Sequence, residues 1–229
     1  FVSKYLRDKF FTDINESFNN TFIIPNSLDR NQEVSVENKK KIVLFVGRIV
    51  KEKGVDLYVD AVKELSTEFS DWSFLLIGSS KLGYDKKSLF EKEIIQTLKK
   101  LDNNVKFQGY VPNEKVKKLM SKSSILVVPS IWQEPFGMTA IEGLSNKMVV
   151  VGSDVGGLSE IINNKGILIS DIDSKKLKLK LKNLLKSSTQ IKKYQNKAWD
   201  NYSFDQKKIS FLQDKMRREI FTKFNNSSE

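Results

Sequence analysis

The chain has 229 residues, 39% hydrophobic and 29% charged, which is ordinary for a globular protein of one or two domains. It contains neither cysteine nor histidine, which excludes disulfides, thiolate or histidine zinc sites, and Ser-His-Asp or Cys-His catalysis. Its net charge of +11 favours an anionic partner, such as a phosphorylated small molecule, a nucleic acid or an anionic membrane, unless the lysines only solubilise the surface.

The first forty residues differ from the rest of the chain. Residues 1–20 predict one amphipathic helix, and TFIIPNSLD (21–29) predicts a strand that ends in a turn. The polar residues 30–40 predict a linker. The start, FVSKYLRDKF, has no initiating Met and no continuous apolar stretch like that of a signal peptide. We therefore expect residues 1–30 to be the end of a preceding domain.

From residue 40 onward, short apolar runs alternate with helical patterns. Continuous apolar runs of this length are typical of parallel strands that are buried on both faces. Six such runs predict strands at residues 41–47, 72–78, 104–111, 124–130, 148–153 and 166–170. Because a helical pattern follows each run, right-handed crossovers predict an α/β fold with a doubly wound, parallel, six-stranded sheet and helices on both faces.

Helices are expected from residue 174 to the end. SKKLKLKLKNLLK (174–186) fits either a strand, by its alternation, or a helix, by the spacing of its leucines, and we favour a helix capped by Ser174. A basic helix lying on a membrane surface is an alternative for this segment. DQKKISFLQDKMRREIF (205–221) predicts a long amphipathic helix whose apolar stripe needs a partner surface.

Candidate ligand-binding residues lie in the strand-to-helix loops, because open α/β sheets bind ligands beyond the carboxyl ends of their strands. In the first loop, GRIVKEKGVD (47–56), Gly47 permits a tight turn, and Arg48 and Lys53 flank a helix start. Two cations at a helix amino end suit a diphosphate without a metal, although ordinary surface cations would look the same. No GxxxxGK[ST] or GxGxxG motif is present, which argues against a P-loop enzyme or a dinucleotide dehydrogenase.

The fourth loop, within SIWQEPFGMTAIEGL (130–144), carries Glu134 and Glu142. Pro135 suits the first turn of a helix, which places Glu134 at its cap and Glu142 roughly 10–12 Å further along the axis. That separation exceeds the roughly 5–9.5 Å between the paired carboxylates of glycosidases, so the two acids should hold two ends of an extended ligand.

Free backbone amides between these two acids suit a phosphate or a sugar oxygen, and we expect them at Phe136, Gly137, Met138 and Thr139. A favourable contact with the helix dipole is the alternative for Glu134, and an exposed helix position is the alternative for Glu142. In the fifth loop, SDVGGLSEII (153–162), the glycine pair forms either a second amide nest or a tight turn.

Taken together and in order, these segments resemble the retaining glycosyltransferases of family 4 (group 1), which have the two-lobed GT-B fold. The resemblance covers about residues 20–224. EPFGMTAIE fits the family's Glu-x7-Glu motif, and the other matching segments are IIPNSLD, VGRIVKEKG, FQGYVP and SDVGGLSEII. Ser27, Lys147, Val149 and the loop IGSSKLG (77–83) depart from the family pattern.

The resemblance implies transfer of a sugar from a nucleotide diphosphate sugar to a glycan or lipid-linked acceptor, as in polysaccharide or lipopolysaccharide synthesis. Arg48 and Lys53 would neutralise the donor diphosphate, and Glu134 would bind hydroxyls of the donor sugar. Glu142 would bind the ribose, amides of residues 137–139 would contact sugar and phosphate, and backbone near Tyr110 would meet the base. The resemblance implies no metal, no other cofactor and no nucleic acid.

The resemblance also predicts the domain organisation. Residues 1–30 would end an amino-terminal lobe, residues 31–200 would bind the nucleotide sugar, and residues 201–229 would form a helix that packs on the other lobe. Because the acceptor-binding lobe is absent from the sequence, the chain looks like the donor-binding half of a cytoplasmic enzyme. Peripheral contact of this enzyme with the inner face of the membrane is compatible with the resemblance. The alternatives are a nucleotide-sugar binding module without turnover and a basic membrane or nucleic-acid binder.

Overall fold

The computed structural model describes residues 1–80 and 87–226, with side chains as far as residue 223, and contains one parallel sheet. The strand order is β3-β2-β1-β4-β5-β6, and every pairing is parallel. The strands are β1 (Lys40–Val46), β2 (Ser73–Ile77), β3 (Val105–Phe107), β4 (Ser123–Val128), β5 (Val149–Ser153) and β6 (Ile167–Ile169). The predicted doubly wound six-stranded sheet is confirmed.

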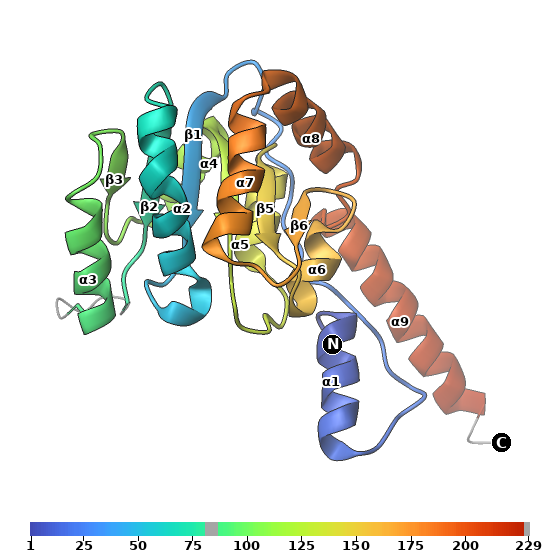
Figure 1. Ribbon diagram of the computed structural model, residues 1–229. Helices are drawn as coiled ribbons and strands as arrows, with labels where there is room; N and C mark the ends of the chain where they lie inside the picture. Colours follow the sequence, from blue (N-terminus) through green and yellow to red (C-terminus); the bar gives the residue numbers. More distant parts are fainter. Residues whose placement is uncertain (81–86, 227–229) are drawn as a thin grey trace.

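Helices cover both faces of the sheet (Figure 1). The helices α2, α3 and α7 contribute to one apolar core, and α4, α5 and α6 contribute to the other, while α8 contributes to both. Their bounds are α2 (Val55–Glu68), α3 (Leu89–Leu98), α4 (Asn113–Lys122), α5 (Met138–Ser145), α6 (Gly156–Ile162), α7 (Ser174–Leu185) and α8 (Ser188–Asp200), with a short 3-10 helix η1 (Lys51–Lys53) before α2. Both faces of the sheet are therefore dry, as the continuous apolar runs require.

The strand order reverses between β1 and β4. The chain winds from β1 outward through β2 to β3, returns to pair β4 against β1, and then winds outward the other way. The loops after β1 and β4 consequently leave the sheet side by side, at the switch point where open α/β sheets bind ligands. This topology brings the predicted first and fourth loops together although they are about eighty residues apart in sequence.

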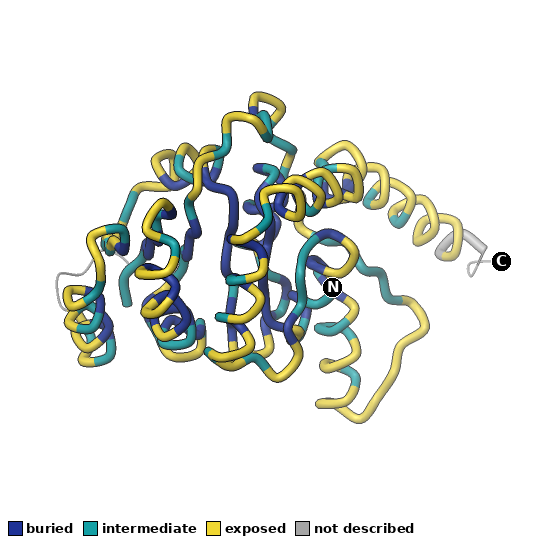
Figure 2. The backbone as a smooth tube through the Cα atoms, turned by 45° about the horizontal axis from the view of Figure 1, so that its top comes forward, coloured by how far each residue is buried: buried dark blue, intermediate teal, exposed yellow. Residues whose placement is uncertain are grey.

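Two helices project from one side of this domain, α1 (Lys4–Ile14) and α9 (Gln206–Asn226) (Figure 1). Most of their surface is exposed (Figure 2). The segments that lead to them are fastened to each other: Leu28 N–H donates to Phe204 O at 2.9 Å, and Arg30 pairs with Asp205 at 3.1 Å. None of the helices in the described part of the chain is long and apolar enough to cross a bilayer.

Three local predictions outside the predicted site were wrong. The first helix ends at Ile14 rather than near residue 20, because Asn15 adopts the left-handed conformation (φ 53°). Residues 21–29 form no strand, since their backbone makes isolated hydrogen bonds, such as Ile24 N–H to Phe1 O at 2.8 Å, instead of a ladder. The helix α7 is capped by Asp173 rather than Ser174, and the Asp173 side chain accepts from the Lys176 amide at 2.6 Å.

Candidate functional site

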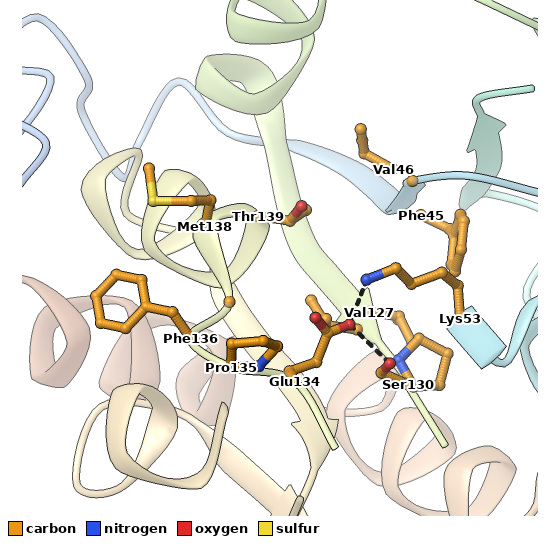
Figure 3. Close-up of a pocket in the computed structure, with 14 residues that line it drawn as sticks. Phe45, Val46, Lys53, Val127, Ser130, Glu134, Pro135, Phe136, Met138 and Thr139 are labelled. Atoms are coloured by element: carbon orange, nitrogen blue, oxygen red, sulfur yellow. Dashed lines mark hydrogen bonds and ion pairs between the residues drawn. The ribbon is translucent and has the colours of Figure 1, made fainter. Parts of the chain in front are cut away.

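A cavity of about 340 Å³ opens at the carboxyl ends of β1 and β4 (Figure 3). Of the predicted site residues, seven line it: Gly47, Lys53, Glu134, Phe136, Gly137, Met138 and Thr139. Phe45, Val46 and residues 127–130 form its strand side. The apolar wall and the few convergent polar groups are typical of a small-molecule site.

The centre of the polar wall is an ion pair between Lys53 and Glu134 (Figure 3). Lys53 Nζ donates to Glu134 Oε1, and Ser130 Oγ donates to the same oxygen at 2.8 Å. Burial raises the pKa of Glu134, but the hydrogen bonds from Lys53 and Ser130 outweigh it, so that the pKa lies below its ordinary value. Glu134 is therefore ionised at neutral pH and acts as a hydrogen-bond acceptor.

Glycine at position 54 allows Lys53 to reach Glu134. Gly54 ends η1 with φ of +64°, and a Cβ there would lie 1.9 Å from the carbonyl oxygen of Pro129. The loop after β1 thus packs directly on the start of the loop after β4. Ile131 N–H also donates to Glu52 O at 3.0 Å, which holds the two loops together.

The glycine pair of the fifth loop supports the backbone of Glu134 and Pro135. A Cβ on Gly156 would lie 2.4 Å from Glu134 O, and one on Gly157 would lie 2.5 Å from Pro135 O. Gly157 N–H donates to Glu134 O at 2.7 Å. Because this amide is already used, the pair acts as a close-packing turn under the Glu134 loop rather than as a nest for a ligand.

The helix after Glu134 begins at Met138, three residues later than Pro135 predicts. Gly137 precedes it with φ of +123°, a conformation that L side chains rarely adopt. The amides of Met138 and Thr139 fall in the first turn, where no helical carbonyl is available to accept them. Met138 and Thr139 line the cavity, and amides in a first helical turn suit an anionic or hydroxyl oxygen.

The Phe136 side chain is part of the core rather than of the binding surface. Its ring is 5% exposed and meets Phe204 edge to face, with 6.1 Å between centroids. Any contact of this position with a ligand would therefore come from its backbone.

Three predicted residues lie outside the cavity lining: Arg48, Tyr110 and Glu142. Arg48 and Tyr110 are exposed. Glu142 is half-buried on α5, where burial raises its pKa and the charge of Lys117 opposes this only in part. Part of the divergent loop 77–83 falls at residues 81–83, outside the described residues.

Sequence reasoning missed Ser130, Gly156 and Gly157 as supports of Glu134. The signal for Ser130 was a hydroxyl at the end of the predicted strand 124–130, at the edge where the site was expected. Among residues 1–80 and 87–226, no group of three or more acidic side chains gathers that could hold a metal ion.

Comparison with known proteins identifies the family of this chain. The family model for glycosyl transferases group 1 matches residues 28–202. An uncharacterised glycosyltransferase of Methanocaldococcus jannaschii is 34% identical over 187 residues, which are 80% of this chain and 48% of that protein. The chain therefore spans about half the length of this relative.

Two solved structures share the fold. HepE from Anabaena, in complex with UDP-glucose, superposes with a TM-score of 0.72 at 19% identity and covers 93% of this chain and 60% of that one. The carboxy-terminal domain of LpcC, a group 1 protein of Francisella tularensis, has a TM-score of 0.62 at 25% identity, over 77% of this chain and 92% of that one. Residues 28–202, which contain the sheet and the cavity at its switch point, form the carboxy-terminal lobe of a GT-B fold. The chain belongs to the group 1 glycosyltransferases.

Proposed function

We propose that the chain is the donor-binding half of a retaining glycosyltransferase, which transfers a sugar from a nucleotide diphosphate sugar to a glycan or lipid-linked acceptor. The observation that carries this proposal is that the Lys53–Glu134 ion pair lines the same cavity as Met138 and Thr139, whose amides lie in the first turn of α5. A cation and helix amides suit a diphosphate, and an ionised carboxylate suits sugar hydroxyls. The solved HepE complex holds UDP-glucose on the same fold.

In this proposal, donor binding exchanges the partners of Lys53. The ammonium group leaves Glu134 for the diphosphate, and Arg48, which is exposed nearby in sequence, adds a second positive charge. Glu134 then accepts hydrogen bonds from the sugar, while Ser130 keeps its carboxylate in place at 2.8 Å. Glu142 binds the ribose, and backbone near Tyr110 meets the base. No metal is needed to balance the diphosphate charge in this arrangement.

The transfer step follows from the same charges. The bond between the anomeric carbon and the phosphate oxygen breaks, and the acceptor hydroxyl oxygen bonds to that carbon on the face from which the phosphate leaves. The acceptor proton passes to the departing diphosphate. Lys53, Arg48 and the helix amides stabilise the negative charge that develops on the leaving group.

Acceptor choice, in this proposal, belongs to an amino-terminal lobe to which residues 1–30 lead, and residues 201–229 pack against it. The exposed apolar side chains of α1, α9 and their connecting segments are the surface it would cover: Phe1, Phe10, Ile14, Phe18, Phe211, Leu212, Ile220 and Phe221. Without that lobe, the chain would bind the donor but not complete transfer. We propose a cytoplasmic site of action, where the +11 charge permits peripheral contact with an anionic membrane.

Calorimetry with UDP tests the site. Lys53→Ala should weaken binding about tenfold or more, because one charge-assisted hydrogen bond contributes about 1.5–3 kcal/mol. Arg48→Ala should weaken it less, since its side chain is exposed. Lys41→Ala is the matched control, because Lys41 lies at the opposite end of β1 and pairs with Asp71. Unchanged affinity in both Arg48→Ala and Lys53→Ala would remove the diphosphate from this site.

A further inference from the structure

Two consecutive carbonyl groups of the loop that carries Glu134 accept hydrogen bonds from residues outside the loop. Glu134 O accepts from Gly157 N–H at 2.7 Å, and Pro135 O accepts from Ser3 Oγ at 2.6 Å. The proline ring fixes φ between these two carbonyls. Together these constraints set the peptide planes that follow Glu134 Cα. The hydrogen bond to Pro135 O comes from Ser3, which lies 132 positions earlier in the chain and outside the segment 28–202 that matches the family.

Ser3 is buried (2% exposed) and makes two hydrogen bonds with one hydroxyl. It donates to Pro135 O and accepts from the Leu6 amide at 3.0 Å as the N-cap of α1. An N-cap needs only the second bond. The first bond therefore ties the amino end of α1 to the Glu134 loop, which a cap alone does not require.

Glu160 of α6 holds the same end of α1 in place. Its two carboxylate oxygens accept from the amides of Lys4 and Tyr5 at 3.0 and 2.7 Å. The first turn of α1 has no acidic residue of its own, so Glu160 supplies the negative charge that a helix amino end favours. Since Gly157 lies on the same short helix, α6 supports the loop both directly and through α1.

We propose that Ser3 and Glu160 are positioning residues of the donor site, which lock the start of α1 onto the 134–137 loop and so orient the Glu134 carboxylate. The inference rests on the proposed donor site. Its consequence is that a displacement of α1 away from α6 breaks the Ser3–Pro135 bond and loosens Glu134. Any partner that moves α1 would thereby change how the sugar is held.

The test measures the titration of Glu134 itself, in the full chain, by carbon-13 NMR of labelled glutamate carboxyls, with the signal assigned from Glu134→Gln. In Ser3→Ala the loop loosens, the bonds from Lys53 and Ser130 weaken, and the pKa of Glu134 rises. We expect a rise of about half a unit or more, which is a threefold change in the dissociation constant. Ser3→Thr keeps the hydroxyl and should restore the wild-type titration.

Ser187→Ala is the matched control. Ser187 caps α8 by accepting from the Gln190 amide at 3.3 Å, so the variant loses a serine cap elsewhere and should leave the Glu134 pKa unchanged. Glu160→Gln, at an exposed side chain, should raise the Glu134 pKa by a smaller amount and decides the question if Ser3→Ala fails to fold. A wild-type Glu134 titration in folded Ser3→Ala, or in Glu160→Gln where the first does not fold, overturns the proposal.

The same variants then bind UDP-glucose and UDP in calorimetry. Ser3→Ala should reduce affinity for UDP-glucose several-fold more than affinity for UDP, because Glu134 faces the sugar. Equal losses for both probes would contradict a positioning role. The titration requires no donor, so it tests the positioning of Glu134 separately from the donor site. If the chain bound neither UDP-glucose nor UDP but the pKa of Glu134 still rose in Ser3→Ala, the donor site would be rejected and the positioning role of Ser3 would be supported.

Discussion

Replacing Gly157 with alanine should displace the Glu134 loop while leaving the rest of the sheet intact. The new Cβ would lie 2.5 Å from Pro135 O and 2.9 Å from Phe136 Cα. Both neighbours are backbone atoms that no rotamer change can move. Reaching an ordinary contact of about 3.4 Å requires a shift of about 0.9 Å, which is incompatible with the 2.7 Å bond from Gly157 N–H to Glu134 O.

The cost of Gly157→Ala follows from these contacts. Overpacking in a dense interior costs about 1–3 kcal/mol, and a lost backbone hydrogen bond costs about 1 kcal/mol more. We expect a loss of about 2–4 kcal/mol in the free energy of unfolding, which a domain with roughly 5–15 kcal/mol of stability survives. Because the loop moves, affinity for UDP-glucose should also fall about tenfold or more.

Urea unfolding and calorimetry with UDP-glucose separate these two effects. Gly166→Ala is the control, because Gly166 lies just before β6, away from the cavity. A Cβ there would lie 2.4 Å from Val150 O, so the overpacking is comparable. It should lose comparable stability and retain affinity for UDP-glucose. If folded Gly157→Ala binds UDP-glucose as tightly as wild type, the glycine pair does not position Glu134.

Three further predictions concern the carboxylates. Because the pKa of Glu134 is lowered on folding, the contribution of its charge to stability is present above about pH 4.5 and is lost as the pH falls through the lower folded value. The free energy of unfolding of Glu134→Gln, measured in urea between about pH 7 and 3, should therefore depend less on pH than that of the wild type. Ser130→Ala removes a hydrogen bond to the ionised form, so the pKa of Glu134 should rise in an NMR titration, and an unchanged value would dismiss Ser130 as a support. Burial raises the pKa of Glu142, so its charge opposes folding as the pH rises above about 4.5; Glu142→Gln should raise the unfolding free energy at pH 7 while weakening UDP binding, and a destabilised variant would contradict this.

The sheet could be predicted from the sequence because its strands are buried on both faces. Each strand appears as a continuous apolar run followed by a helical pattern, and that signal is local. The same reasoning failed at residues 21–29, where an apolar run has no neighbouring strand to pair with. Pairing is a property of the fold, so residue types alone do not reveal its absence.

The site was predictable as a set of loops but not as a geometry. The switch-point rule placed Lys53 and Glu134 at the same edge of the sheet, yet their ion pair spans 81 positions and depends on the contact of Gly54 with Pro129. The preference of proline for a first helical turn misplaced the start of α5, because the positive φ of Gly137 sets that start instead. Ser3 carries no local signal beyond that of an N-cap.

A crystal structure of the chain soaked with UDP-glucose tests the central claim most directly. We predict diphosphate oxygens at about 3 Å from Lys53 Nζ and from the amides of Met138 and Thr139, with the glucose hydroxyls on Glu134 and the Lys53–Glu134 ion pair broken. A nucleotide bound elsewhere, or bound in this cavity with that ion pair intact, would contradict the account.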